Sequence, residues 1–120
     1  MDVNGPRIEV VQHDGITEVE ILDEEILDEI VISKLSETLF SLIEEQESIR
    51  LLISFSRVRH LSSSALGFLI RLHKRIGESG GELRLCCIGP TIYEIFKITK
   101  LDKVFEIFED KGKALRSLGG

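Results

Sequence analysis

The chain has 120 residues, of which 42% are hydrophobic, and a formal net charge of −6 at pH 7. This length suits one globular domain with a single core, and the composition excludes a disordered chain. The net negative charge argues against nucleic-acid binding, which needs clustered lysine and arginine. No apolar run approaches the roughly 18 residues that cross a bilayer. The start, MDVNGPRIEV, has neither the basic nor the apolar region of a signal peptide, so no secretory signal is expected. We expect one cytoplasmic domain over residues 1–120, with a core over about 7–118.

The first half of the chain begins with two segments that alternate apolar and polar residues. RIEVVQ (7–12) and ITEVEIL (16–22) flank His13-Asp14-Gly15, which predicts a β-hairpin. The acidic residues that follow, around Ile26 and Leu27, are interpreted as solvated surface near the positive end of a helix. That helix is predicted to end near Glu47, from apolar residues at spacings of three and four: Ile32, Leu35, Leu39, Leu42 and Ile43.

The second half alternates between strands and helices. Its predicted elements are a buried strand (50–55), a helix (63 to about 79), a strand (82–88), a helix (90 or 91 to about 99), a short strand (104–108) and a closing helix (110–118). This order predicts an α/β fold with a mixed, mostly parallel sheet of four or five strands and about four helices.

Cys86 and Cys87 are adjacent in the predicted strand LRLCCI. Neighbouring strand residues point to opposite faces, so we expect two free thiols that do not readily form a disulfide with each other. The chain has no CxxC motif, and its three histidines are scattered in sequence. A zinc site is therefore not expected.

The segment LLISFSRVRHLSSSALGFLI (51–70) is the most informative part of the chain. An apolar strand leads through a polar loop to three consecutive serines that open a helix, so we expect Ser62 or Ser63 at the helix N-terminus. Serine is a favoured N-cap, and capping alone would explain such a run. The amide groups at this end lack intrahelical partners and tolerate negative charge.

This segment resembles the signature of STAS domains (sulfate transporter and anti-sigma-factor antagonist), D-x-S-x-V-x-x-I/L-D-S-S/T-G-L-G. The residues that agree are Ser56, Val58, Leu61, Ser63, Ser64, Leu66 and Gly67. Ser54 and Ser62 replace the two usual aspartates, and Ala65 replaces a glycine. The similarity continues over residues 80–115, which include an "ITKLDKVF" segment like the family's "TGLDKLF".

The resemblance implies a compact α/β sandwich and the function of an anti-sigma factor antagonist. Such a protein binds, when unphosphorylated, an anti-sigma factor that is also a serine kinase of the histidine-kinase-like ATPase type. Ser63 occupies the position of the phosphorylated serine, and a phosphatase would reset the switch. ATP belongs to the partner, so no cofactor is expected here. Ser62 removes a carboxylate that the kinase could read, and Ala65 adds a methyl group where a partner could approach.

The second helix is predicted to pack on the sheet through one face, formed by Leu66, Leu69, Ile70, His73 and Ile76. Phe68 falls on the outward side, beside Arg71 and Arg75. An exposed aromatic residue is either ordinary or a contact anchor, and the resemblance favours the anchor. The residues predicted to bind a partner are Ser62, Ser63, Ser64, Ala65, Phe68 and Arg71.

Two other functions are weighed against the antagonist. One is a STAS module without phosphorylation that acts as a ligand-responsive or assembly subunit in a signalling complex. The other is an enzyme with Ser63 as nucleophile, for which His60 is the only nearby base. The serines do not stand in a G-x-S-x-G motif and no phosphate-binding glycine motif is present, so no enzyme activity is expected.

Overall fold

The computed structural model describes residues 8–119. Five strands form a mixed sheet in the order β1-β2-β4-β6-β7, in which β1 is antiparallel to β2 and the other pairs are parallel. The strands are β1 (Ile8–His13), β2 (Ile16–Ile21), β4 (Arg50–Ser54), β6 (Glu82–Cys86) and β7 (Glu106–Phe108). The helices are α1 (Glu29–Glu45), α2 (Ser63–Glu78), α3 (Pro90–Ile98) and α4 (Lys111–Ser117), with a 3₁₀ turn, η1 (Leu101–Lys103). The predicted α/β fold class is confirmed.

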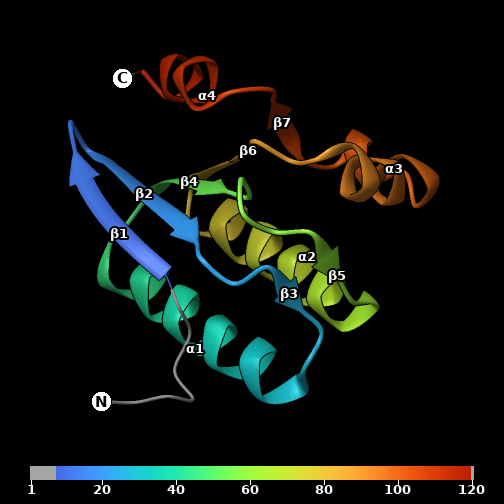
Figure 1. Cartoon of the computed structure of the whole chain (residues 1–120). Helices are drawn as coiled ribbons and strands as arrows, with labels where there is room; N and C mark the ends of the chain where they lie inside the picture. Colours follow the sequence, from blue (N-terminus) through green and yellow to red (C-terminus); the bar gives the residue numbers. More distant parts are fainter. Residues whose placement is uncertain (1–7, 120) are drawn as a thin grey trace.

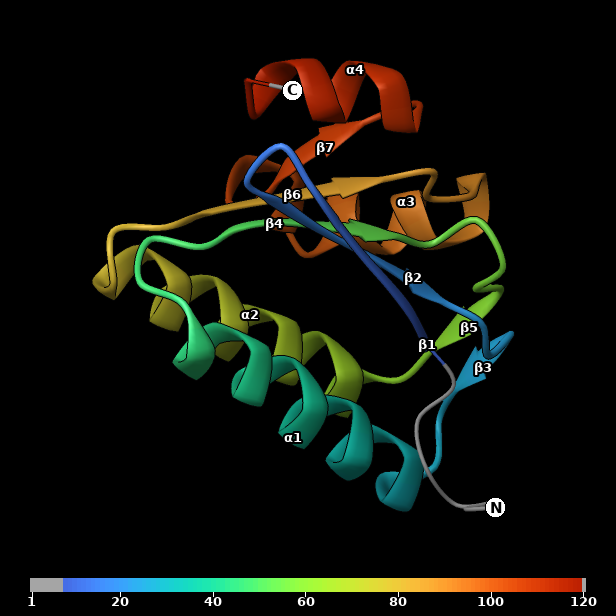
Figure 2. The same ribbon diagram turned by 90° about the vertical axis from the view of Figure 1, so that its left-hand side faces the viewer.

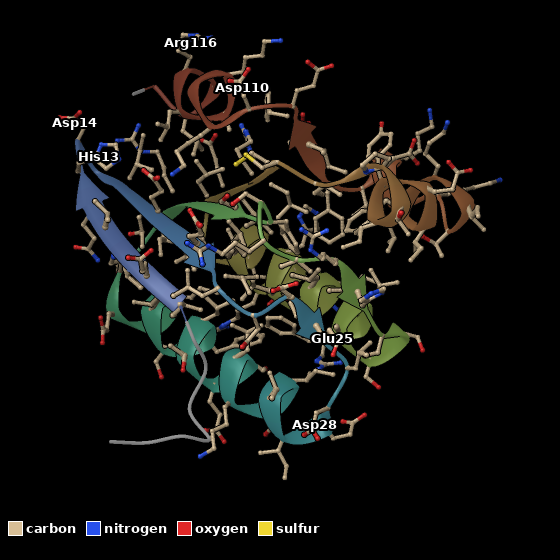
Figure 3. All side chains as sticks on the ribbon, in the orientation of Figure 1. His13, Asp14, Glu25, Asp28, Asp110 and Arg116 are labelled. Carbon is tan, nitrogen blue, oxygen red and sulfur yellow. The ribbon has the colours of Figure 1, made fainter. Side chains whose placement is uncertain are left out.

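The hairpin between β1 and β2 lies where the alternating pattern placed it. Asp14 and Gly15 form its two-residue turn, with φ of 51° and 77° respectively. A two-residue turn with positive φ at both residues matches the right-handed twist of the paired strands, and Asp-Gly is a favoured pair in such a turn. His13 and Asp14 lie at the tip of this hairpin (Figure 3).

The sheet separates two apolar layers of unequal size. Helices α1 and α2 lie side by side on one face, and α4 covers the other (Figures 1 and 2). In β4, Leu51 and Ile53 belong to the larger core, whereas Leu52 packs in the smaller cluster beneath α4. This burial on both faces explains the continuous apolar character of the strand. Ile92 and Phe96 bring α3 into the larger core.

Helix α1 forms where its apolar spacing predicted it. Asp28 caps its N-terminus, because the Asp28 carboxylate accepts hydrogen bonds from the amides of Ile30 at 2.7 Å and Val31 at 3.4 Å. The side chains that it buries are Ile32, Leu35, Leu39 and Ile43. No helix in residues 8–119 is long and apolar enough to span a membrane.

A second, two-stranded parallel sheet was not predicted. It pairs β3 (Glu25–Ile26) with β5 (His60–Leu61). Two-residue strands carry no periodicity, so the residue pattern at these places indicates only an acidic surface and a loop. The amide of Ser62 donates to the carbonyl of Ile26 at 3.1 Å, which continues this pairing to the start of α2. The small sheet therefore fixes the position of the triple serine.

The expectation that Cys86 and Cys87 point to opposite faces is wrong. Strand β6 ends at Cys86, and Cys87 has a φ of 62°, in the left-handed region. This turn of the backbone directs the two side chains toward each other, and their sulfur atoms lie 3.4 Å apart. Both cysteines are free thiols.

Candidate functional site

The candidate site is the N-terminus of α2, which the main sheet, the small sheet and α1 hold in place. Ser62 is the N-cap: it has extended backbone, and its hydroxyl oxygen accepts a hydrogen bond of 3.2 Å from the amide of Ala65. Its carbonyl accepts the first intrahelical bond, 3.1 Å from the amide of Leu66. The predicted position of Ser62 and Ser63 at a helix N-terminus is confirmed.

The three serines have different roles in the structure. The half-buried Ser62 caps the helix, and the Ser64 hydroxyl donates a hydrogen bond of 2.9 Å to Glu29 Oε1 on α1. Ser63 is exposed, and within residues 8–119 its hydroxyl has no hydrogen-bond partner. Of the three hydroxyl groups, that of Ser63 is the one that is exposed and makes no hydrogen bond within residues 8–119.

Charges of both signs flank the serine hydroxyls. On one side lies the carboxylate of Glu29, close to the start of α1, where Asp28 also lies; Glu25 is on the adjacent β3 (Figure 3). On the helix itself, Gly67 and Arg71 follow Ser63 at intervals of four residues, so all three share one face. The Arg71 guanidinium folds over Gly67, with Nη1 3.6 Å from the point that a Cβ there would occupy. Arg71 is exposed, as predicted.

Two of the predicted partner-binding residues do not lie on the surface. Phe68 and Ala65 are each 1% exposed and belong to the main core. Phe68 lines the same narrow interior gap as Ile26, Leu35 and Phe55. The prediction that Phe68 points outward is wrong, because the buried face of α2 is rotated by about 60° from the predicted one at 100° per residue. The buried residues of α2 are Ala65, Leu66, Phe68, Leu69, Leu72 and Ile76.

The rotation of the helix exposes a residue that was assigned to the core. Ile70 is 41% exposed. Two further exposed apolar residues, Leu27 and Ile30, flank the cap of α1, which adjoins α2 through the bond between Ser64 and Glu29. The sequence shows that α2 and the start of α1 contain apolar residues. Which of these residues are exposed depends on how the two helices pack. We call Leu27, Ile30, Ser63, Ser64, Ile70 and Arg71 the serine surface.

The geometry required for a nucleophilic serine is not found at this site. His60 is exposed on β5, and no hydrogen bond joins it to any of the three serines in the described part of the chain. A serine nucleophile needs such a base within hydrogen-bond reach. The described residues also contain no group of three or more histidine, cysteine, aspartate or glutamate side chains that could hold a metal ion.

Two clefts lie close to the loop that leads into the serines. The larger, about 650 Å³, is bordered by residues of the 22–25 segment together with Ser56, Arg57, Arg59 and His60. The smaller, about 360 Å³, lies between the loop that carries Val58 and the N-terminus of α3. Ser56 lines both clefts and donates from its hydroxyl to Glu20 Oε2 at 3.3 Å.

The fold and site together define a small α/β domain that presents a serine-capped helix beside exposed apolar side chains. The STAS domain model matches residues 7–114, and the chain belongs to this family. It is 24% identical over 112 residues to the anti-sigma F factor antagonist of Paenibacillus polymyxa, covering 93% of this chain and 94% of that protein.

Solved structures agree on the fold. An anti-sigma factor antagonist from Mycobacterium paratuberculosis superposes with a TM-score of 0.82 at 23% identity, over 99% of this chain and 98% of the other. The phosphorylated form of the Bacillus cell fate determinant SpoIIAA superposes with a TM-score of 0.70 at 14% identity, over 93% and 99% of the two chains. The resemblance inferred from the serine motif is confirmed.

Proposed function

We propose that this STAS domain is an anti-sigma factor antagonist that binds an anti-sigma factor through the serine surface and is released when Ser63 is phosphorylated. The observation that carries the proposal is that the three serine hydroxyls make different contacts. Ser62 is occupied as a cap and Ser64 by Glu29, whereas the hydroxyl of Ser63 is exposed and free to react. The match to proteins named as anti-sigma factor antagonists supports the class of partner.

The proposed switch acts through charge. Phosphorylation adds roughly −1.5 to −2 charges. The first amides of α2 and the helix dipole tolerate this charge, so the fold persists. A partner that buries the exposed side chains of Leu27, Ile30 and Ile70 must then also remove water from a dianion, and affinity falls.

In this proposal the partner is an anti-sigma factor that is itself a serine kinase of the histidine-kinase-like ATPase type. ATP binds to that partner, and the STAS domain is a binding module that needs no cofactor and catalyses no reaction. A phosphatase returns Ser63 to the free hydroxyl. The proposed location is the cytoplasm, where such a kinase and a sigma factor would meet it. Phosphorylation by this kinase does not depend on a carboxylate at position 62.

The test is phosphorylation by the ATPase encoded beside the gene or captured from native lysate without ATP. After incubation with this kinase and ATP, mass spectrometry is expected to place one phosphate on Ser63. Ser63→Ala is expected to bind the partner with and without ATP, and Ser63→Asp to bind more weakly, as a partial imitation with one charge. Ser41→Ala, at an exposed serine of α1 outside the serine surface, is the matched control and keeps the switch. Phosphate on another serine, or undiminished binding by Ser63→Asp with no phosphate found, would contradict the proposal.

The alternative of a ligand-responsive STAS module has one observation in its favour. The cleft of about 650 Å³ is lined by charged side chains of both signs, including Glu24, Arg57 and Arg59, and adjoins the loop before the serines. A small polar ligand held there would act on the serine surface without phosphorylation. Loss of partner binding after Arg57→Ala, together with binding by the parent protein that ATP does not change, would favour this function over the switch.

A further inference from the structure

The pair Cys86–Cys87 has a geometry that ordinary strand residues do not have. Cys86 ends β6, and the left-handed φ of 62° at Cys87 brings the two sulfur atoms to 3.4 Å. Residues other than glycine seldom adopt this conformation, because their Cβ clashes with the backbone. A hydrogen bond of 3.2 Å from the Cys87 amide to the carbonyl of Phe108 on β7 helps to hold the backbone in place. The backbone thus holds the two sulfur atoms next to each other.

The two sulfur atoms differ in access. Cys86 is fully buried beneath α4, in the small core cluster with Leu52 and Ala114. Cys87 is half-buried and lines the cleft of about 360 Å³ between the 56–60 loop and the start of α3. A small solute that enters this cleft reaches Cys87 first.

We propose that Cys86 and Cys87 form a reversible oxidation site, at which hydrogen peroxide converts the dithiol into a vicinal disulfide. In the first step Cys87 Sγ attacks one oxygen of the peroxide. The O–O bond breaks, and the products are a sulfenic acid on Cys87 and one water. In the second step Cys86 Sγ attacks the sulfur of Cys87, the S–O bond breaks, and the hydroxyl leaves as water with the proton of Cys86. In total, two thiols and one peroxide give one disulfide and two waters.

The chemistry of the two thiols supports this order. Burial, together with the interaction between the two thiols, raises the pKa of Cys86 to about 12, so Cys86 is poorly suited to react with peroxide itself. Cys86 acts in the second step, because its sulfur atom already lies next to that of Cys87 and the two groups need no diffusional encounter. The sulfur atoms must close from 3.4 Å to about 2.05 Å.

The disulfide would be strained, and strain makes it easy to reduce. Consecutive Cα atoms are about 3.8 Å apart, below the usual 4.4–6.8 Å for bridged cysteines. Strained disulfides have the higher reduction potentials typical of regulatory bonds rather than structural ones. Ring closure also changes the dihedral angles at Cys87, on the wall of the cleft opposite Val58 and His60. The oxidised and reduced forms therefore differ next to the loop that leads into the serine surface.

The experiment uses the reduced 120-residue chain, whose two cysteines are Cys86 and Cys87. After treatment with hydrogen peroxide, the expected product is a monomer that has lost both thiols and the mass of two hydrogens. Dithiothreitol is expected to restore both thiols. Mass gain by oxygen addition without loss of the second thiol, a disulfide-linked dimer, or two thiols that stay unreacted would overturn the proposal.

Single-cysteine variants test the order of the steps. Cys87→Ser leaves the buried thiol and is expected to resist the same peroxide treatment. Cys86→Ala removes the second thiol and is expected to leave a sulfenic acid on Cys87 that a cyclic 1,3-diketone traps. If Cys86→Ala fails to fold, because its side chain is part of the core, the result with Cys87→Ser decides. Rapid oxidation of Cys86 in that variant would contradict the proposed first step.

Discussion

The hydroxyl of Ser64 donates a hydrogen bond of 2.9 Å to Glu29 Oε1 and so joins the first turns of α2 and α1. The contact places a carboxylate against the residue that follows Ser63, although Ser62 stands where the family signature has an aspartate. A negative charge on Ser63 therefore meets two opposed effects. The N-terminus of α2 attracts it, and Glu29 repels it.

This relationship predicts coupling between positions 63 and 29. We expect Ser63→Asp to be more stable relative to serine in a Glu29→Gln background than in the parent, by about 0.5 kcal/mol. Urea unfolding of the four proteins of this double-mutant cycle measures the difference. The coupling should fade at about 1 M salt, where the screening length is about 3 Å. Equal effects of Ser63→Asp in both backgrounds at low salt would show that Glu29 does not act on this site.

Phe68 is buried and Ile70 is exposed, the reverse of what the helical periodicity predicts, and this gives a second prediction. Phe68→Ala is expected to cost about 3–5 kcal/mol of unfolding free energy, as for a buried phenylalanine. Ile70→Ala, at an exposed position, is expected to stay within about 1 kcal/mol and to weaken binding of the anti-sigma factor. Chemical denaturation and a binding titration separate the two effects. Full binding by Ile70→Ala would remove Ile70 from the serine surface.

The error over Phe68 shows what hydrophobic periodicity can and cannot predict. The apolar residues of α2 cover a wide arc, because the helix packs against both α1 and the sheet. Periodicity locates such an arc but does not say which of its edges is buried. Phe68 at one edge lies inside and Ile70 at the other lies outside. The other three helices and the five strands of the main sheet lie close to the predicted residue ranges.

Other features of the site depend on contacts between distant residues or on backbone geometry. The pairing of Ile26 with Leu61 and the bond between Glu29 and Ser64 join segments more than 30 residues apart, with no local pattern to mark them. The left-handed conformation of Cys87 has no signal in sequence either, since glycine is the residue expected there. The triple serine could be found because a strand, a loop and a cap occur in one continuous segment.

Two glycines near the end of α2 give a matched pair of stability predictions. A Cβ at Gly81 would lie 2.5 Å from the carbonyl oxygen of Ile49, on the backbone of the neighbouring segment. Gly81→Ala is therefore expected to destabilise the protein by about 1–3 kcal/mol. A Cβ at Gly77, inside the helix, meets nothing within 4 Å, and Gly77→Ala is expected to stabilise by about 0.5–1 kcal/mol. Urea unfolding measures both, and equal effects would contradict the close approach at Gly81.

The ion pair between Glu18 and Lys111 predicts how stability depends on pH. Lys111 Nζ lies 2.7 Å from Glu18 Oε1, and His13 Nε2 lies 2.9 Å from Oε2 of the same carboxylate. Burial alone would raise the pKa of Glu18, but the hydrogen bonds and charges of Lys111 and His13 together lower it below 4.5. The hydrogen bond to Glu18 in turn raises the pKa of Lys111 above 10.5.

The signs of these two shifts define the pH range in which the pair stabilises the fold. A lowered carboxylate pKa gives stability that is present above pH 4.5 and is lost as the pH falls through the folded-state pKa. A raised lysine pKa gives stability that is present below pH 10.5 and is lost as the pH rises through the folded-state pKa. Glu18→Gln is thus expected to lower the melting temperature at pH 7 and to have a smaller effect at an acid pH below the folded-state pKa of Glu18, where the parent carboxylate is protonated. Glu109→Gln is the matched control, since Glu109 is exposed and 3.6 Å from Lys113, and it should have little effect at either pH. An equal loss of melting temperature for Glu18→Gln at both pH values would mean that the residue stabilises the fold by packing and not by its charge.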